Sequence, residues 1–223
     1  MSQSSTSTLS LEEQVQKYAS ISAATAHEAM GRMGAVDSAI KPLRLGMKLL
    51  GIAFTCRSHP GDNFTLHAAL KMARPGEIIV CDSGGFTEQG AFGDVMASCA
   101  IGMGIKGLLI DGSVRDSEEV HRIGFPVFSR GVSIKGTVKE TFGTLKEPVC
   151  IGGAIVHTGD LIIGDDDGVV VVPAAQIPTL YQVCEAREET EKRFRKELME
   201  GKTTWDMLGL QALAEKKNIK ITF

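Results

Sequence analysis

The sequence predicts a mixed α/β domain built in layers. Short runs rich in Ile and Val recur between turn signals, and several of these runs come in pairs, which is typical of strands. Pro-Gly pairs at 60–61 and 75–76 mark turns. Segments with apolar residues at helical spacing, as at 66–72, predict two or three core helices. Strands and helices that alternate in this way pack as a sheet covered by helices.

The bulk properties favour one domain with appendages. The chain has 223 residues, of which 43% are hydrophobic, and this is ample for a core. Its net charge is −3 and no Lys/Arg-rich run stands alone, so the electrostatic footprint of a nucleic-acid binder is missing. We therefore expect no nucleic-acid partner, and an anionic substrate has to be bound by local groups.

The cysteine spacing and the apolar segments indicate the cellular compartment of the protein. The cysteines are odd in number, widely spaced and never form C-x-x-C, which argues against a disulfide framework or a zinc site. The N-terminus has neither a basic n-region nor an apolar h-region, and no later segment approaches the roughly 20 apolar residues of a membrane span. We expect a soluble cytoplasmic protein without a membrane partner.

The chain is expected to become ordered at Ser10. Residues 1–9 form a Ser/Thr-rich tail that is predicted to be disordered. S-L-E-E at 10–13 is a capping-box pattern and predicts the start of a first helix. A second helix is predicted over 23–33, closed by Gly34.

Strands and turns alternate through the next part of the chain. The runs M-K-L-L-G-I-A-F-T-C and I-I-V-C-D predict strands on either side of the helix at 66–72. Asp62 and Asn63 precede that helix and are interpreted as caps rather than ligands.

The stretch from Gly90 to Glu119 carries the strongest functional pattern. Two glycines, Gly90 and Gly93, precede a helical segment at 94–101, which is typical of a turn that presents backbone N–H groups at a helix start. The apolar run 108–110 predicts a buried strand that ends at Asp111-Gly112. Arg115 and Asp116 then lie just past the carboxyl end of a strand, which is where ligands bind in open α/β sheets.

These residues offer a specific kind of chemistry. Arg115 can bind a carboxylate in a bidentate fork, and Asp116 supplies a hard oxygen ligand suited to Mg²⁺ or Mn²⁺. The helix start at Gly93, Asp94, Val95 and Met96 can hold a second anionic group. Together they suit a small, multiply carboxylated substrate and a metal. The alternative is a surface pair of Arg and Asp without a catalytic role, and the residues alone leave both open.

The last part of the chain predicts further strands and a helical extension. Strands are expected at 125–128 and 150–156, and 161–163 is expected to pair with 169–172 across a turn of three aspartates and a glycine. A long charged helix is predicted over 174–198 and a final short helix over 205–213.

Four segments carry a family resemblance. A-F-G-D-V-M, I-D-G-S-V-R-D-S-E-E, A-T-A-H-E-A-M-G-R and G-D-L-I-I-G-D-D-D-G-V-V-V-V-P resemble the class II pyruvate aldolases that cleave 4-hydroxy-4-methyl-2-oxoglutarate and 4-carboxy-4-hydroxy-2-oxoadipate. That family is similar in fold to the RraA regulators of ribonuclease E. The likeness runs from about Leu11 to Phe223, and its most discriminating piece is R-D-x-x-E, at Arg115, Asp116 and Glu119.

The resemblance implies a fold and an assembly. The fold is an RraA-like swivelling β/β/α sandwich over 10–175, including the N-terminal helices, followed by a helical extension over 176–223 that packs on a neighbouring subunit. A homotrimer or homohexamer is implied, with Glu28 and Glu191 completing a neighbour's active site. Asp94 is implied to act beside a divalent metal, Mg²⁺ or Mn²⁺, held by Asp116.

The function that follows is a metal-dependent retro-aldol lyase. It would release pyruvate, plus pyruvate or oxaloacetate, from a branched 4-hydroxy-2-oxo di- or tricarboxylic acid, with oxaloacetate decarboxylation as a side activity. The R-D-x-x-E element contains no lysine, so a Schiff-base route has no visible nucleophile there. The alternative is a non-enzymatic RraA-like regulator of ribonuclease activity, and the presence of Asp116 favours the enzyme.

Overall fold

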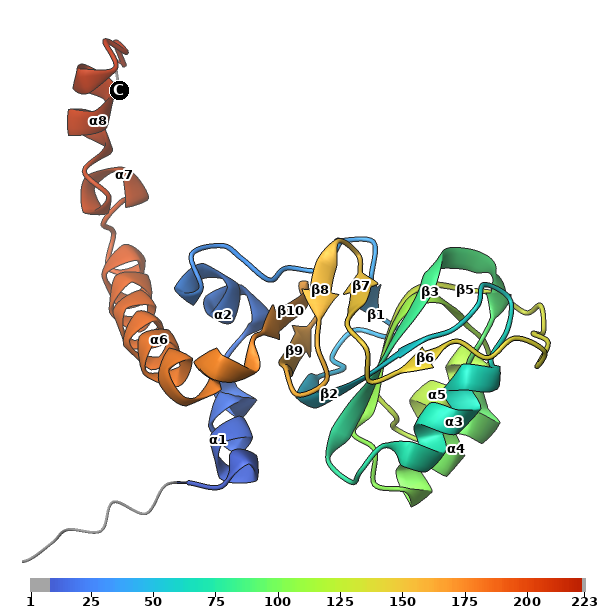
Figure 1. The fold of residues 1–223 in the computed structure, drawn as a ribbon. Helices are drawn as coiled ribbons and strands as arrows, with labels where there is room; N and C mark the ends of the chain where they lie inside the picture. Colours follow the sequence, from blue (N-terminus) through green and yellow to red (C-terminus); the bar gives the residue numbers. More distant parts are fainter. Residues whose placement is uncertain (1–8, 222–223) are drawn as a thin grey trace, which may run out of the picture.

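The computed structural model describes residues 9–221, so nearly all of the predicted tail 1–9 lies outside the described residues. Its main sheet has the strand order β1-β5-β4-β3-β2-β9-β10, with β6 paired to β2 (Figure 1). These strands are β1 (Lys41–Pro42), β2 (Leu49–Arg57), β3 (Glu77–Gly90), β4 (Gly107–Val114), β5 (Val127–Val132), β6 (Thr144–Leu145), β9 (Leu161–Asp165) and β10 (Gly168–Val172).

Helices cover one face of the parallel part of this sheet. Strands β2, β3, β4 and β5 are parallel neighbours, and α3 (Phe64–Met72), α4 (Asp94–Gly102) and α5 (Ser117–Arg122) connect them (Figure 1). Successive side chains of β3 point to opposite faces, so Ile79 packs in the core beneath these helices and Ile78 packs in the core on the other face. The carboxyl ends of the parallel strands consequently meet at one edge, where ligands bind in such sheets.

A small hairpin forms a third layer on the face away from these helices. Its strands, β7 (Val149–Ile151) and β8 (Ala154–Val156), pair with each other and not with the main sheet. Val149 and Val156 pack there against Phe128 and other buried residues of the sheet. The order of layers is therefore helices, sheet and hairpin, which confirms the prediction of a mixed, layered α/β fold.

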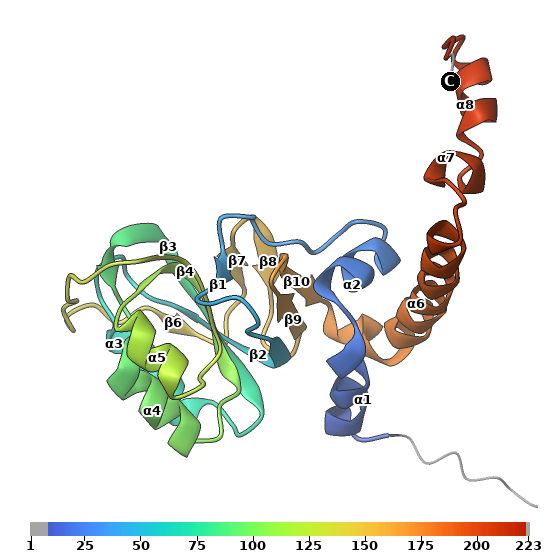
Figure 2. The ribbon, with the colours of Figure 1, turned by 180° about the vertical axis from the view of Figure 1, so that it is seen from behind.

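The antiparallel end of the sheet is covered by helices from both ends of the chain. These are α1 (Leu11–Lys17), the 3-10 helix η1 (Tyr18–Ser20), α2 (Ala23–Ala29), the 3-10 helix η2 (Ala174–Gln176) and α6 (Ile177–Met199). Tyr18 is buried among them, and its hydroxyl donates to the Ile177 carbonyl at 2.7 Å. The helices α7 (Thr204–Met207) and α8 (Leu210–Lys216) lie beyond the end of α6, away from the sheet (Figures 1 and 2).

Several local predictions are confirmed. Ser10 and Glu13 form the full capping box at the start of α1. Strands β9 and β10 pair antiparallel across Asp166 and Asp167. In that hairpin Asp165 is buried, and its Oδ2 accepts from the Ala23 N–H at 2.9 Å, so this carboxylate ties the turn to α2.

Several predicted elements differ in extent, and the segment 150–156, predicted as a strand, is the hairpin of β7 and β8 because the chain turns at Gly152 and Gly153. The second helix, predicted over 23–33, ends at Ala29, because Gly31 and Arg32 have left-handed backbone angles (φ 71° and 67°). The strand predicted over 108–110 continues to Val114, so Asp111 and Gly112 lie inside it and not after it. The helix predicted over 174–198 is α-helical only from Ile177, after a 3-10 turn.

The final helix, predicted over 205–213, is two short helices. Gly209 separates them with a φ of 61°, a conformation that glycine adopts without strain. Among the described residues, none of the helices combines the length and the apolar character that crossing a membrane requires.

Candidate functional site

Arg115 and Asp116 lie at the carboxyl end of β4, where α5 begins. The Arg115 N–H donates to the Phe92 carbonyl at 2.8 Å, which ties this strand end to the turn before α4. Asp116 has left-handed backbone angles, φ 53° and ψ 38°, which cost roughly 1–2 kcal/mol for a residue with a side chain. The Val120 N–H donates to the Asp116 carbonyl at 2.9 Å, so the first turn of α5 helps to hold this conformation.

The two side chains form an ion pair. Arg115 Nε lies 3.2 Å from Asp116 Oδ2, and the side chains keep 45% and 38% of their area exposed. A pair this exposed contributes little to stability. Within the described residues, Arg115 has no second carboxylate partner, so the rest of its guanidinium faces solvent and can bind an anion.

The glycines before α4 make room for this pair. A Cβ placed on Gly93 would lie 3.1 Å from Arg115 Cγ and would collide with Asp116 Oδ2. A Cβ on Gly90 would lie 2.7 Å from Arg115 Cβ. The two glycines of the sequence pattern therefore lie directly beside Arg115 and Asp116, and the absence of side chains lets the turn and the strand end approach closely.

The start of α4 is the predicted anion site. Gly93 is its N-cap and has no side chain to satisfy the first N–H groups of the helix. The Val95 N–H instead donates to Oδ1 of Asp94 at 2.8 Å. A ligand carboxylate that bound the Val95 N–H would displace this contact. The Val95 side chain is 74% exposed, whereas Met96 is buried.

Two neighbouring cavities share Arg115 and Asp94. The larger, of about 580 Å³, is lined by four carboxylates and two guanidiniums. The smaller, of about 270 Å³, lies between the start of α4, helix α3 and the loop at 136–139. One side of Arg115 is thus rich in negative charge and suits a cation, while the other side suits an anion.

The smaller cavity contains residues that the sequence patterns did not select. His67 comes from α3, and Lys139 from the loop before β6. Partial burial and, next, the positive charge of Lys139 hold the pKa of His67 below its ordinary value. Neither residue belongs to a motif, and only the folded chain brings them beside Arg115.

Asn63 also lines this cavity, and the prediction that it caps α3 is wrong. Its side chain makes no capping hydrogen bond, whereas Asp62 Oδ1 accepts from the Phe64 N–H at 2.7 Å. Asn63 Nδ2 donates to the Ala91 carbonyl at 3.0 Å, and its Oδ1 is buried without a hydrogen-bond partner. A hydrogen-bond donor that reached this buried acceptor would stabilise it, because a buried polar atom without a partner is energetically costly.

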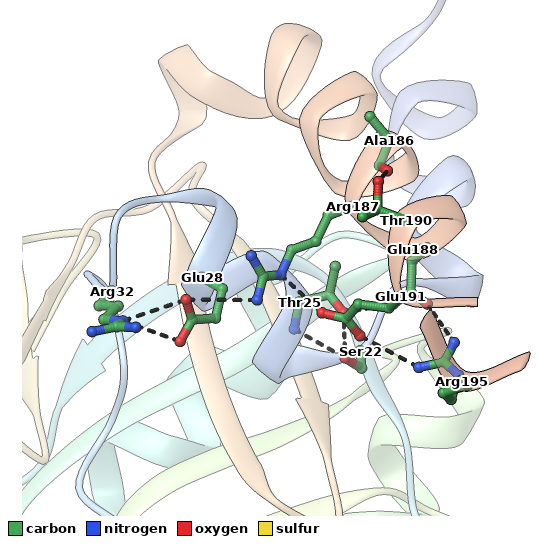
Figure 3. A network of polar contacts seen from close by, with 10 residues as sticks. All are labelled: Ser22, Thr25, Glu28, Arg32, Ala186, Arg187, Glu188, Thr190, Glu191 and Arg195. Atoms are coloured by element: carbon green, nitrogen blue, oxygen red, sulfur yellow. Dashed lines mark hydrogen bonds and ion pairs between the residues drawn. The ribbon is translucent and has the colours of Figure 1, made fainter. Parts of the chain in front are cut away.

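Glu28 and Glu191 lie together, but not in either of these cavities. Arg187 Nη2 lies 3.7 Å from Glu28 Oε2, and Arg187 Nε lies 3.0 Å from Glu191 Oε1 (Figure 3). Glu28 also accepts from Arg32 Nε at 3.1 Å, and Arg195 contacts Glu191 at 3.4 Å. The structure thus groups Arg115, Asp116 and Asp94 in one place and the two glutamates in another.

The donors around Asp116 fit a cation that keeps most of its water. Within residues 9–221 there is no group of three or more His, Cys, Asp or Glu side chains arranged to hold a metal ion. Mg²⁺ is commonly held by only one or two carboxylates, with water and substrate oxygens as its other ligands. Asp116 supplies such a carboxylate, and Asp94 lines the same cavity.

Comparisons with known proteins point to one family. The Aldolase/RraA family, described as RraA-like, matches residues 19–171. In Halalkalibacterium halodurans, the protein named "Putative 4-hydroxy-4-methyl-2-oxoglutarate aldolase" is 33% identical over 165 residues, which cover 74% of this chain and 79% of that protein.

Solved structures are similar over most of the chain. An uncharacterized protein from Pseudomonas syringae has a TM-score of 0.79 at 28% identity, covering 88% of this chain and 92% of its own. RraAS2 from Streptomyces coelicolor, described as an unusual member of the RNase ES inhibitor RraA protein family, has a TM-score of 0.74 at 28% identity. That likeness covers 83% of this chain and 98% of RraAS2.

Proposed function

The chain belongs to the Aldolase/RraA family, and on this basis we propose that it is a divalent-metal-dependent retro-aldol lyase. Its substrate would be 4-hydroxy-4-methyl-2-oxoglutarate or 4-carboxy-4-hydroxy-2-oxoadipate. The products would be pyruvate together with a second pyruvate or with oxaloacetate. The observation that carries the proposal is Asp116, held beside Arg115 at the end of β4 and facing the start of α4.

The reaction breaks the bond between C3 and C4 of the substrate. The 4-hydroxyl loses its proton and C4 becomes a ketone, while the bonding electrons move into the enolate of pyruvate, which is then protonated at C3. The difficult step is therefore the formation of negative charge on the oxygen at C2. A divalent cation held by Asp116 would supply Lewis-acid stabilisation of that charge.

The remaining residues bind and orient the substrate. The Arg115 guanidinium neutralises charge on the 2-oxo oxygen or the adjacent carboxylate. The first N–H groups of α4, at Val95 and Met96, bind the carboxylate of the pyruvyl half. Asp94 lines both cavities, and its carboxylate orients water on the metal side of the site.

Glu28 and Glu191 would contribute to the proposed active site only in an oligomer. Because they lie apart from Arg115 in their own chain, they would complete the site of a neighbouring subunit in a trimer or a dimer of trimers. The extension formed by α6, α7 and α8 would pack on that neighbour.

A second candidate is a regulator of ribonuclease activity, for which the likeness to RraAS2 is the support. Asp116 separates the two proposals, because a carboxylate beside the anion-binding Arg115 serves a metal-dependent lyase and has no evident use in a binding surface.

The test is pyruvate release from a panel of 4-hydroxy-2-oxo acids, measured before and after treatment with a chelator. We expect turnover that is abolished by the chelator and restored by Mg²⁺ or Mn²⁺. Asp116→Asn keeps the size of the side chain and removes its charge, so it should bind the metal weakly and lose activity even at high Mg²⁺. Full activity after exhaustive chelation would exclude the metal-dependent reaction, and no turnover of any acid would favour the regulator.

A further inference from the structure

The smaller cavity contains a second cation, Lys139, to which the binding of the pyruvyl half assigns no role. We propose that Lys139, with Asn63 and His67 beside it, forms a subsite for the carboxylate at the far end of the substrate, on the C4 side of the bond that is broken. This inference rests on the proposed function. It defines the substrate as a 4-hydroxy-2-oxo acid with a second carboxylate, and it assigns Lys139 as the residue that selects for that group.

The first argument is that Lys139 is an unpaired cation. Lys135, on the same loop, binds Glu88 with 2.7 Å between Nζ and Oε2. Lys139 forms no ion pair within residues 9–221, although it lines a cavity that already contains Arg115. Its charge does reach His67, because it contributes to lowering the pKa of that histidine. Two cations and one carboxylate, Asp94, therefore face the same cavity, and the balance favours an anionic ligand.

The second argument is that the backbone around Lys139 is fixed. The Val138 N–H donates to the Gly61 carbonyl and the Asn63 N–H donates to the Val138 carbonyl, both at 3.1 Å. On the other side of Lys139, the Glu140 N–H donates to Oδ2 of the buried Asp62 at 2.7 Å. Hydrogen bonds on both sides thus hold the Lys139 backbone at the cavity, which lowers the entropy cost of binding a ligand there.

The third argument concerns Asn63. Its Nδ2 is committed to the Ala91 carbonyl, so its Oδ1 is the acceptor that remains without a donor. The substrate class carries a hydroxyl group on C4, next to the carboxylate that Lys139 would bind. Because Oδ1 is buried, a rotation of the Asn63 side chain would bring it to the cavity, where a hydroxyl that donated to it would satisfy the acceptor and place the far carboxylate on the side of Lys139.

The test compares two substrates that differ only at this carboxylate. 4-Hydroxy-4-methyl-2-oxoglutarate carries it, and 4-hydroxy-4-methyl-2-oxopentanoate has a methyl group in its place. Lys139→Gln should lower the ratio of the two kcat/KM values by roughly 30-fold, since a hydrogen bond to a charged group is worth about 2 kcal/mol. Lys135→Gln is the matched control, because it removes a positive charge from the same loop outside the cavity, and it should leave the ratio unchanged.

Three results would overturn the subsite. Equal losses of kcat/KM on both substrates would make Lys139 part of the general machinery, and unchanged kcat/KM values for both substrates would make it a surface residue. Covalent trapping of pyruvate on Lys139 by borohydride would make it a Schiff-base nucleophile.

A second measurement separates the subsite from the proposed function. If the wild-type protein cleaves neither acid, calorimetry with 2-oxoglutarate and 2-oxopentanoate still tests the cavity. Binding of the dicarboxylate that weakens at least tenfold in Lys139→Gln, with little change for 2-oxopentanoate, would support the subsite without a lyase. Equal binding of 2-oxoglutarate by wild type and variant, or no binding by either, would refute it.

Discussion

Glu28 and Glu191 contact the same guanidinium, that of Arg187, although they lie on helices from opposite ends of the chain (Figure 3). Both glutamate side chains remain about one-third exposed, at 33% and 38%. A cation shared by two carboxylates reduces the repulsion between them and fixes their spacing. The protein thus presents a preformed, partly exposed pair of glutamates on α2 and α6.

The first prediction tests whether this pair serves a neighbour. Arg115→Ala and Glu191→Ala should each be inactive when prepared alone. If each site combines Arg115 of one subunit with the glutamates of another, unfolding and refolding the two variants together at equal amounts should restore about a quarter of the wild-type activity, because that fraction of sites receives both intact halves. The measurement is pyruvate release from the mixed assembly.

The control is the same mixture made without subunit exchange, which should stay inactive. Lys192→Gln provides a matched variant, since Lys192 lies on α6 next to Glu191 and, among the described residues, forms an ion pair only with Glu189, at 3.9 Å. It should retain full activity. Mixed assemblies with no more activity than the separate variants would show that each chain uses its own residues alone.

A second prediction concerns Gly93. In Gly93→Ala the new methyl group collides with Asp116 Oδ2 and crowds Cγ and Nε of Arg115, which are side-chain atoms and not backbone. The fold should therefore survive, with a melting temperature within a few degrees of wild type, while the displaced pair lowers kcat/KM by about 10²-fold. Gly102→Ala is the control, because a Cβ at that end of α4 meets no atom within 4 Å. Equal activity of the two variants would show that the position of Asp116 and Arg115 does not matter.

Features encoded in contiguous residues were predictable from the sequence. The capping box at Ser10 and the turn from Gly90 to Gly93 depend on neighbours within a few positions, and the structure forms both. Arg115 could be placed near a strand end because a short apolar run precedes it, although the strand continues past Gly112 to Val114. The same reasoning failed where a single backbone conformation decided the outcome, as at Gly31, where α2 has already ended.

The smaller cavity could not be predicted because its parts are distant in sequence. Asp62 looks like a helix cap, and it does cap α3, but its other oxygen also binds the backbone of the loop that carries Lys139. That tertiary contact brings Lys139 to His67, and no spacing rule signals it. An isolated lysine in a loop is ordinarily a solvated surface residue, and what distinguishes Lys139 is that it lines the same cavity as Arg115.

A third prediction follows from the pKa of His67. Desolvation and then Lys139 lower it, so the folded protein binds this proton less readily than the unfolded chain does. As the pH falls through about 6.5, the unfolded state takes up the proton first, so His67 lowers the free energy of unfolding in this range. Histidine resonances followed by NMR should show His67 titrating below 6.5 in the free protein.

Two perturbations should move this titration in the same direction. Lys139→Gln removes the positive charge that helps to lower the pKa of His67. A bound dicarboxylate places negative charge beside the imidazole ring of His67. Each change should therefore raise the pKa of His67. Lys135→Gln should have no such effect. If neither Lys139→Gln nor 2-oxoglutarate changed the pKa of His67, the histidine would not lie close enough to the proposed subsite to respond to its charge.

The last prediction separates catalysis from substrate capture at Arg115. Arg115→Lys keeps the positive charge but loses the fork of donors. If Arg115 stabilises charge that develops in the transition state, kcat should fall by about 10²-fold, as for the loss of an oxyanion contact. If it binds substrate and transition state equally, KM should rise with kcat nearly unchanged. Arg44→Lys is the control and should change neither constant, since within residues 9–221 the Arg44 guanidinium hydrogen-bonds only to the Leu43 carbonyl. The Arg115 pair is exposed, so the melting temperature should barely move in Arg115→Lys or Arg115→Ala. A large loss of melting temperature with kcat intact in the folded fraction would instead identify Arg115 and Asp116 as a structural ion pair.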